Sequence, residues 1–227
     1  MSRLFVLALF GVACGVACGR GEALEEGADV LQSTKPIEQI DIFVNGFHYA
    51  SGDMSMQEEA NHYCSRKEDG LIQCVLYDGT EPDANMIGIE HIVSREVFDA
   101  LSADEKALWH PHTYEVKSGA LIAPGLPPAA EHELMEMLVS TYGKTWHVWH
   151  PGETDLPEGT STLMKGFYAD GQLDPGLLRA RDERFGVDAA ELARQRADIE
   201  DPGFDEVVLE EPRVGVCEDG VGPGPRG

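Results

Sequence analysis

The stretch Leu108-Trp109-His110-Pro111-His112-Thr113-Tyr114-Glu115-Val116-Lys117-Ser118-Gly119 holds the densest polar chemistry of the chain. His110 and His112 stand two positions apart, so on a regular strand both side chains would face the same side of a sheet. Two imidazoles on one face are typical of metal ligation. The pattern therefore makes His110 and His112 candidate ligands for a divalent ion such as Zn²⁺.

The second half of this stretch carries a carboxylate and an amine. Glu115 and Lys117 have the opposite parity, so on a regular strand they would share a face with each other and not with the histidines. Pro111 favours an edge strand or a bend over an interior strand, and a bend could bring Glu115 towards the histidines. Glu115 and Lys117 are candidate catalytic residues on this basis.

Composition bounds the class of protein. The chain has 227 residues, of which 42% are hydrophobic, enough for a domain with a real core. Its 41 acidic residues against 17 basic ones give a formal net charge of −24. This charge argues against nucleic acid as a partner and against electrostatic binding to anionic lipid through basic residues. It predicts a solvated acidic surface, with weak cation binding as the alternative.

Residues 1–18 have the pattern of an export signal. An apolar core over residues 4–10 is too short to span a bilayer as a helix, and Gly-Val-Ala then precedes Cys14 and again Cys18. This resembles the lipobox of bacterial lipoproteins, although Gly stands where Leu is usual. We expect lipidation at Cys18 (or Cys14) and a membrane-anchored location in the cell envelope, on the periplasmic or surface side. An ordinary cleaved secretory peptide is the alternative.

The remainder divides by texture into four parts. Residues 19–35 are polar and acidic and predict a tether, and residues 36–165 carry the strand and helix signals of an α+β domain. We expect a mixed or antiparallel sheet flanked by helices. Residues 166–201 predict a charged helical extension, and residues 202–227 an acidic tail rich in Pro and Gly, without fixed structure.

Local patterns assign the individual elements. A strand or a short buried helix is expected over 40–44, with Asn45-Gly46 as a turn, and strands are expected over 71–77, 86–93 and 145–149. Helices are expected over 56–64, after the capping residues Ser94 and Ser102, over 131–142 with Gly143 as the cap, and over 173–185 and 187–199.

The cysteines of the domain allow two interpretations. Cys64 ends the expected helix and Cys74 lies on the next strand, so in an exported protein a disulfide is the plain structural reading. A thiolate–imidazole site for a metal or for redox chemistry, using the neighbouring His62, is the functional alternative. Cys217 lies in the acidic tail with no evident partner.

Several motifs in the same order resemble one family, the oil body-associated proteins, a domain of unknown function found in plants, fungi and bacteria. The resemblance covers roughly residues 40–163 and departs from the family pattern at Pro111. The motifs that carry it are His62-Tyr63-Cys64, Gln73-Cys74-Val75-Leu76-Tyr77-Asp78, Ile87-Gly88-Ile89-Glu90-His91-Ile92, the stretch 108–119, and Tyr142-Gly143-Lys144-Thr145-Trp146-His147-Val148-Trp149.

The resemblance implies lipid-droplet association in plant members and no established catalytic activity. Because relatives also occur in the reducing cytosol, it leaves the role of the two cysteines open. Glu90 stands in an apolar run and must pair or bind if it is buried. The candidate metal ligands are His62, His110 and His112, and the candidate catalytic groups are Glu90, Glu115 and Lys117. The candidate ligand-binding residues are His62, Tyr77, Glu90, His110, His112, Glu115, Lys117 and His147.

Three hypotheses of function follow. The first is an exported, lipid-anchored domain with a histidine-rich pocket for a metal or a small ligand. The second is a metal-dependent enzyme with His62, His110 and His112 as ligands and Glu90 or Glu115 as base. The third is a non-catalytic module, structural or bound at a lipid surface, whose histidines complete core hydrogen bonds. The sequence names no protein partner and no substrate.

Overall fold

A closed antiparallel sheet forms the centre of the structure, a computed structural model that describes residues 33–210. Residues from Gln39 onward belong to one compact unit, and residues 33–38 to a separate one. The strand order is β4-β3-β2-β1-β7-β6-β5, and an additional pairing of β4 with β6 closes six strands into a barrel. The strands are β1 (Ile42–Ala50), β2 (Asp53–Arg66), β3 (Ile72–Tyr77), β4 (Met86–Val93), β5 (His110–Pro111), β6 (Tyr142–His147) and β7 (Thr162–Lys165).

The expectation of an antiparallel sheet with helices is confirmed, whereas its closure was not foreseen. Two local expectations in the first half of the barrel are wrong. The segment expected as a helix over 56–64 lies within β2, where pairing on both edges outweighs its helix-forming residues. Asn45-Gly46 is no turn but the middle of β1, where Asn45 donates to Asn61 at 3.1 Å.

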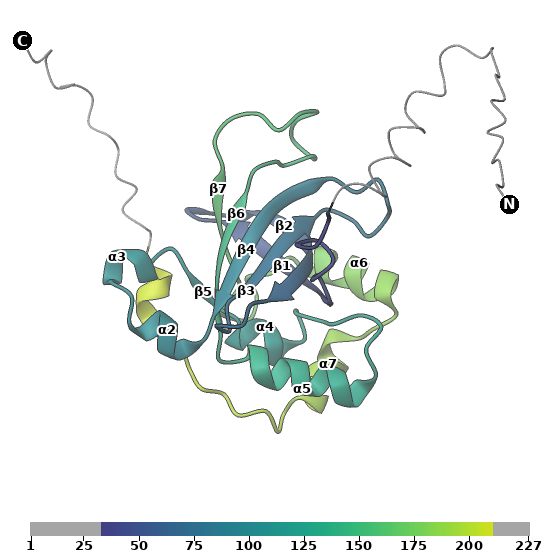
Figure 1. Cartoon of the computed structure of the whole chain (residues 1–227). Helices are drawn as coiled ribbons and strands as arrows, with labels where there is room; N and C mark the ends of the chain where they lie inside the picture. The colour runs from purple at the N-terminus through teal and green to yellow at the C-terminus, as the bar shows by residue number, and fades with distance from the viewer. Residues whose placement is uncertain (1–32, 211–227) are drawn as a thin grey trace, which may run out of the picture. The chain divides into compact units, whose positions relative to one another are not determined.

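The helices lie around the barrel (Figure 1). Ser94 and Ser102 cap α2 and α3 as expected, and Gly186 ends α6 in the left-handed conformation. The helix expected over 131–142 begins and ends earlier, and Gly143 is a residue of β6 rather than a cap. The helices are α2 (Arg95–Asp99), α3 (Ala103–Lys106), α4 (Thr113–Ser118), α5 (Pro128–Leu138), α6 (Pro175–Phe185), α7 (Ala189–Gln195) and the 3-10 helix η1 (Glu206–Leu209).

The central stretch changes from strand to helix at His112. β5 ends at Pro111, His112 is the N-cap of α4, and Glu115 and Lys117 therefore lie on a helix. The prediction that Glu115 and Lys117 share the opposite face of a regular strand is therefore wrong, because the strand ends at Pro111. The bend brings Glu115 to the same side as the histidines, and Gly119 ends the helix with a φ of 78°.

The sequence predicts an export signal at the N-terminus and an acidic tail at the C-terminus. The tail begins with described structure, since η1 packs Val208 against Phe98 and Trp109. Cys14, Cys18 and Cys217 lie outside the described residues. In the described part of the chain, no helix is both long enough and apolar enough to cross a membrane.

Register across the sheet decides what the barrel encloses. Cys64 pairs with Cys74, Cys74 with Glu90, and Glu90 with Thr145, so these side chains share the inner face. The structure joins Cys64 and Cys74 by a disulfide between neighbouring strands. Their Cα atoms are 4.0 Å apart, slightly closer than the expected disulfide range of about 4.4–6.8 Å.

The barrel interior has an apolar end and a polar end. Ile72 and Ile92 pack with Leu138 of α5 and Val116 of α4, which close the apolar end. Beyond them the inward positions are polar, beginning with Glu90 and its surrounding imidazoles. The core thus surrounds a cluster of ionisable groups instead of excluding it.

Candidate metal centre

Four histidines and one glutamate meet inside the barrel, and we call this group the Glu90 centre. The ligands come from separate elements, since β1 carries His48, β2 carries His62, β4 carries Glu90, and the β5–α4 bend carries His110 and His112. All five residues are buried, with at most 4% of their surface exposed. Antiparallel pairing therefore assembles side chains that are up to 64 positions apart.

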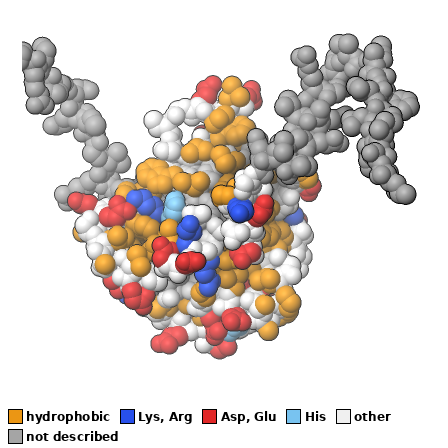
Figure 2. All heavy atoms as spheres, viewed as in Figure 1, with side chains coloured by type: hydrophobic (Ala, Val, Ile, Leu, Met, Phe, Trp, Pro, Cys, Tyr) orange, Lys and Arg blue, Asp and Glu red, His pale blue; other side chains and the backbone are white. Residues whose placement is uncertain are grey.

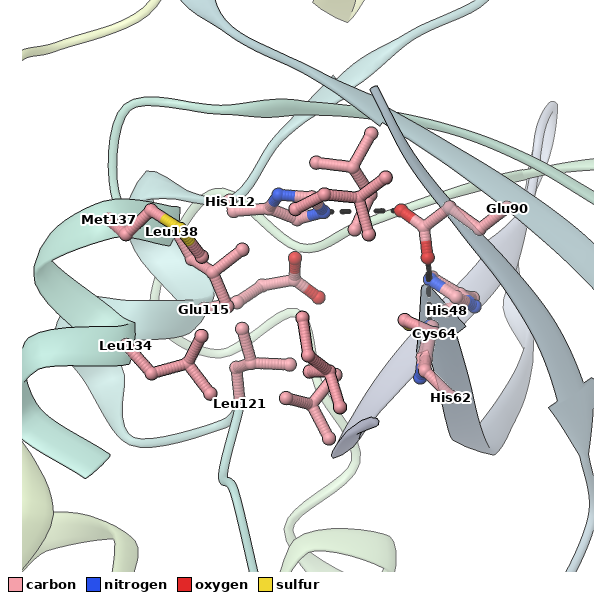
Figure 3. Close-up of a pocket in the computed structure, with 14 residues that line it drawn as sticks. His48, His62, Cys64, Glu90, His112, Glu115, Leu121, Leu134, Met137 and Leu138 are labelled. Carbon is pink, nitrogen blue, oxygen red and sulfur yellow. Dashed lines mark hydrogen bonds and ion pairs between the residues drawn. The ribbon is translucent and has the colours of Figure 1, made fainter. Parts of the chain in front are cut away.

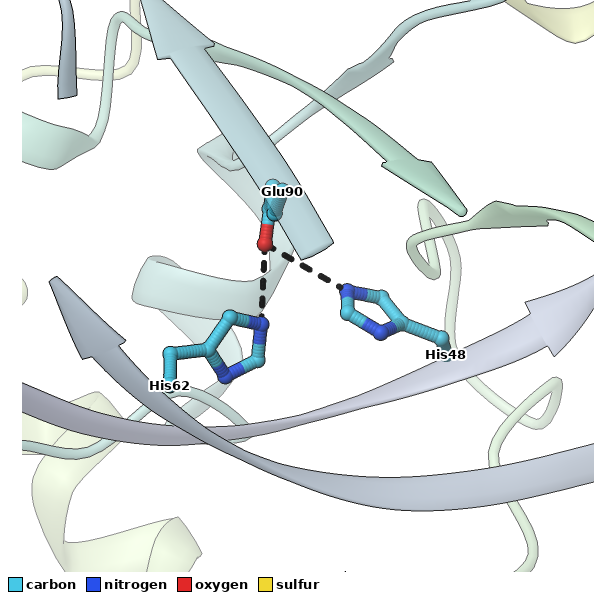
Figure 4. Close-up of side chains that lie close together, drawn as sticks. All are labelled: His48, His62 and Glu90. Carbon is cyan, nitrogen blue, oxygen red and sulfur yellow. Dashed lines mark ion pairs between the residues drawn. The ribbon is translucent and has the colours of Figure 1, made fainter. Parts of the chain in front are cut away.

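The carboxylate of Glu90 lies between the imidazoles (Figure 4). Its Oε2 atom is 2.8 Å from Nε2 of His62 and 3.9 Å from Nε2 of His48. Its Oε1 atom is 3.2 Å from Nε2 of His112 and 3.5 Å from Nε2 of His110. Each histidine thus presents the same ring nitrogen to one carboxylate.

The other ring nitrogen of His62 fixes its tautomer. Nδ1 of His62 lies 3.1 Å from the carbonyl oxygen of Ala60, which can only accept, so Nδ1 carries the hydrogen. In the neutral imidazole Nε2 then bears a lone pair. That lone pair faces Oε2 of Glu90, which is itself an acceptor.

His112 is held in the same way by a different group. The hydroxyl of Thr141 donates to the carbonyl oxygen of Leu138 at 2.7 Å, so Oγ1 of Thr141 accepts from Nδ1 of His112 at 2.8 Å. Nε2 of the neutral ring again bears a lone pair, directed at Oε1 of Glu90. A divalent ion, unlike a proton, can accept lone pairs from several donors at once.

Electrostatics favour an ionised Glu90 beside neutral histidines, the charge states that bind a cation. Burial works to raise the pKa of Glu90, but the surrounding imidazoles of His112 and His62 hold it well below its usual range, so the group is a carboxylate. Burial lowers the pKa of His110 to about 3 and that of His48 well below 6.5. Both are neutral near pH 7 and able to ligate a metal.

The remaining nitrogens of the centre are unsatisfied. Nδ1 of His48 and both ring nitrogens of His110 are buried and have no hydrogen-bond partner within residues 33–210. Most buried polar groups in proteins do have one, so each exception calls for an explanation. A bound ion would account for Nε2 of His110.

The distances from Glu90 oxygens to His62, His110 and His112 match those between ligands of a shared ion. Donors about 2.0–2.2 Å from one metal stand about 2.8–3.6 Å from each other in octahedral or tetrahedral geometry. Mutual distances up to 4.8 Å define two sets, His48 with His62 and Glu90, and His110 with His112 and Glu90. The expected trio of His62, His110 and His112 is therefore divided between the two oxygens of Glu90.

Two glycines leave room for the cluster. A methyl group on Gly143 would lie 1.9 Å from Oε1 of Glu90 and 2.9 Å from Nε2 of both His110 and His112. A methyl group on Gly166 would lie 2.6 Å from Cδ2 of His110. Any larger residue at Gly143 would fill the space among the donors.

Glu115 reaches the same cavity from α4 (Figure 3). Burial, followed by the charge of Glu90, raises its pKa well above 4.5, so it is protonated when no cation is present. A divalent ion could be balanced by both carboxylates. The cavity has a volume of about 20 Å³, which holds about one water molecule and excludes a large substrate.

Three residues of the expected site lie elsewhere. Lys117 donates to the carbonyl oxygens of Arg196 and Ile199 and so holds the end of α7. Tyr77 packs its ring against Tyr63, whose side chain has the outward parity of β2. His147 faces inward but pairs with Glu58 rather than with Glu90.

Sequence reasoning missed His48 and Glu58 and treated His150 as ordinary packing. His48 was lost because Asn45-Gly46 was taken as a turn. In β1 it has the same parity as Val44, which is the signal that could have placed it on the inner face. Glu58 was hidden in the segment expected as a helix.

Comparison with known proteins identifies the relatives. Residues 34–200 match the family model described as "Protein of unknown function (DUF1264)". The chain is 38% identical over 184 residues to oil body-associated protein 2A of Zea mays, covering 80% of this chain and 73% of the relative. It is 37% identical over 180 residues to oil body-associated protein 1B of Arabidopsis thaliana, covering 79% and 75%. No solved structure matches.

Proposed function

The chain belongs to the DUF1264 family and is similar to oil body-associated proteins along most of its length, and we propose that it is a metal-binding protein. The ion is a divalent first-row transition metal held by the Glu90 centre. Imidazole and carboxylate donors suit Zn²⁺, Fe²⁺, Ni²⁺ and Cu²⁺ better than Ca²⁺ or Mg²⁺.

The observation that carries this proposal is the pair of fixed tautomers. His62 and His112 each use Nδ1 as a donor, so each neutral ring directs the lone pair of Nε2 at Glu90. Such acceptor-to-acceptor contacts are unfavourable in a buried site without a cation. Held orientation of the distal nitrogen is also the arrangement that tunes metal-binding histidines.

Metal content of the purified full-length chain tests the proposal. The chain is stripped with a chelator, loaded with Zn²⁺ and analysed for bound metal by mass spectrometry. Glu90→Gln, His110→Ala and His112→Ala should each lower the affinity at this centre at least about 100-fold, because ligand loss exceeds the 10–100-fold effect of outer partners. Melting temperatures measured in parallel separate ligand loss from unfolding.

His91→Ala provides the matched control. His91 is adjacent to Glu90 on β4 but has the opposite parity, so its side chain lies on the outer face. The His91→Ala variant should bind Zn²⁺ with the same affinity as the parent. If the parent binds no metal, or if the Glu90→Gln chain binds as tightly as the parent, the metal function is rejected.

The size of the cavity bears on whether the ion is catalytic. About 20 Å³ admits water but no acyl chain, which favours retention of the ion over turnover of a large substrate. Glu115, protonated beside the cavity, favours one enzymatic alternative, in which it delivers a proton to a small molecule bound at the ion. Glu115→Gln would abolish such an activity while leaving Zn²⁺ bound.

Membrane attachment is the second part of the proposal. The Gly-Val-Ala-Cys motifs at Cys14 and Cys18 support a lipid-anchored chain in the cell envelope. Mass spectrometry of the membrane fraction should find an acylated N-terminal cysteine. An unmodified N-terminus in the soluble fraction would reject the anchor without affecting the metal site.

A lipid-surface role is a second candidate, suggested by the names of the relatives. Val75, Ile89 and Trp146 are in register across β3, β4 and β6 on the outer face, and Ile89 is 41% exposed. Figure 2 shows hydrophobic side chains interspersed with charged ones on the face viewed. Flotation with triacylglycerol droplets should be reduced in Ile89→Asp if this face binds lipid, and unchanged if it does not.

A further inference from the structure

A second group of donors lies towards the polar end of the barrel, outside the Glu90 centre. Glu58 projects inward from β2, His147 is the last residue of β6, and His150 follows in the connection to β7, which extends beyond the barrel (Figure 1). Their donor atoms all lie within 4.8 Å of one another. We propose that Glu58, His147 and His150, here called the Glu58 site, bind a second divalent transition metal ion.

The geometry is that of a carboxylate shared by two imidazoles. Oε2 of Glu58 is 2.7 Å from Nδ1 of His147, and Oε1 is 3.0 Å from Nδ1 of His150. These separations are close to the 2.8–3.6 Å or so expected between ligands of one ion. Two histidines and one carboxylate leave further coordination positions open for water, as in many accessible metal sites.

A supporting contact holds the ring of His150 as the rings of metal ligands are held, and burial confines that of His147. Nε2 of His150 is 3.1 Å from Oγ1 of Thr162, and when that nitrogen donates, Nδ1 directs a lone pair at the position between the donors. The side chain of His147 is fully buried by the barrel. Its Nε2 atom has no hydrogen-bond partner in the part of the chain that the structure describes.

Exposure distinguishes the two sites. The side chain of Glu58 is 22% exposed and that of His150 is 14% exposed, against 1% for Glu90. An ion at the Glu58 site can therefore exchange with solvent without opening of the barrel. We infer that a chelator removes this ion first and the ion at the Glu90 centre much later.

The two sites are neighbours through His48. His48 pairs directly with Glu58 across β1 and β2, and its ring lies edge-to-face with that of His147 at a centroid distance of 5.6 Å. Two bound cations at such close range repel each other. Occupation of the inner site should consequently weaken binding at the Glu58 site.

Calorimetric titration of the stripped full-length chain with Zn²⁺ tests the inference. Two classes of site are expected. Glu58→Gln and His150→Ala should each remove the rapidly exchanging class, and Glu90→Gln should remove the slowly exchanging class at the Glu90 centre. Thr162→Val, which keeps every ligand but loses the contact to His150, should weaken the rapid class about 10–100-fold. His150 lies in a connecting segment, so its variant keeps the test decisive if Glu58→Gln does not fold.

His132→Ala is the matched control, because His132 is a partly exposed histidine on α5 that pairs with Asp198 and belongs to neither site. Both classes should persist in this variant. If Glu58→Gln and His150→Ala bind as many ions as the parent, the second site is refuted and the three groups are a hydrogen-bonded cluster only. If the parent shows the rapidly exchanging class but not the slowly exchanging class assigned to the Glu90 centre, the proposed function is rejected and the Glu58 site is retained.

Discussion

Two buried regions of this protein contain charged groups, and they treat those groups differently. The first surrounds Arg181, and Lys165 is treated in the same way at a different buried position; both lie outside the inner face of the barrel. Arg181 donates to the carbonyl oxygens of Ala120 and Gly119 at 2.7 and 2.9 Å and to Asp182 at 2.8 Å. Lys165 donates to the carbonyl oxygens of Trp109 and Val208 at 2.9 and 3.0 Å, and also to that of Ala107.

The second region is the Glu90 centre, where the protein does not complete its own hydrogen bonds. His110 has two unpartnered ring nitrogens among the described residues, and His62 and His112 direct lone pairs at a carboxylate. Arg181 and Lys165, by contrast, are surrounded by acceptors. This contrast supports the proposal that a metal ion completes the Glu90 centre.

Removal of Arg181 should have the largest effect on folding. Arg181→Met would leave two carbonyl oxygens and Asp182 without their buried donor, and should lower the free energy of unfolding by about 3–5 kcal/mol in urea titrations. Zn²⁺ bound per folded molecule should not change. Arg179→Met, at an exposed position of the same helix, should cost less than about 0.5 kcal/mol. A loss of metal from fully folded Arg181→Met would contradict the separation of the two regions.

A methyl group placed among the donors should act next most strongly. Gly143→Ala forces Glu90 and two imidazoles apart, so we expect loss of Zn²⁺ binding together with about 1–3 kcal/mol of stability, measured by calorimetry and urea unfolding. Gly152→Ala, where a methyl group would meet nothing within 4 Å, should be neutral in both. Full Zn²⁺ affinity in Gly143→Ala would show that the ion does not lie among these donors.

Glu90→Gln should distinguish the Glu90 centre from the Arg181 region by the sign of its effect on the free energy of unfolding. In the metal-free chain the amide of Gln can donate to Nε2 of His62 or His112, so stability should stay the same or rise by about 1 kcal/mol. With Zn²⁺ at 100 times its dissociation constant, the parent should gain about 2.7 kcal/mol that the variant does not. A metal-free variant that is less stable by several kcal/mol would mean that Glu90 is a structural ion-pair partner, as Arg181 is.

The smallest effect is expected at an exposed pair. A hydrogen bond to Asp198, with further attraction from that group, Glu136 and Glu131, raises the pKa of His132 above 6.5. Its contribution to stability is therefore fully present below pH 6.5 and is lost as pH rises through the raised pKa. His132→Ala should be destabilised relative to the parent at about pH 5.5 and hardly at all at about pH 9. An equal difference at both pH values would rule out the ionic contribution.

The sequence predicted the parts of the fold that depend on local chemistry. The strand over 86–93 and the caps Ser94 and Ser102 match the structure because polar flanking residues determine them locally. β2 was mistaken for a helix because its residues favour helices in isolation. Only pairing with β1 and β3, which no local pattern reports, makes it a strand.

The candidate site divides in the same manner. His110, His112 and Glu90 could be chosen from spacing and from a carboxylate in an apolar strand. His48 was harder to choose, because Asn45 and Gly46 interrupt the apolar pattern of β1. The side chain of Asn45 is accommodated there by hydrogen bonds with Glu59, Asn61 and Arg181. Closure of the barrel, which sets these residues side by side, depends on the distant pairing of β4 with β6.

Anomalous X-ray diffraction from crystals of the Zn²⁺-loaded full-length protein tests the central claim most directly. The account predicts a peak at the zinc edge inside the barrel, about 2.0–2.2 Å from a Glu90 oxygen and from Nε2 of His62 or of His112. Absence of any peak within the barrel, with the imidazoles still facing Glu90, would contradict it and would show that protons alone complete the centre.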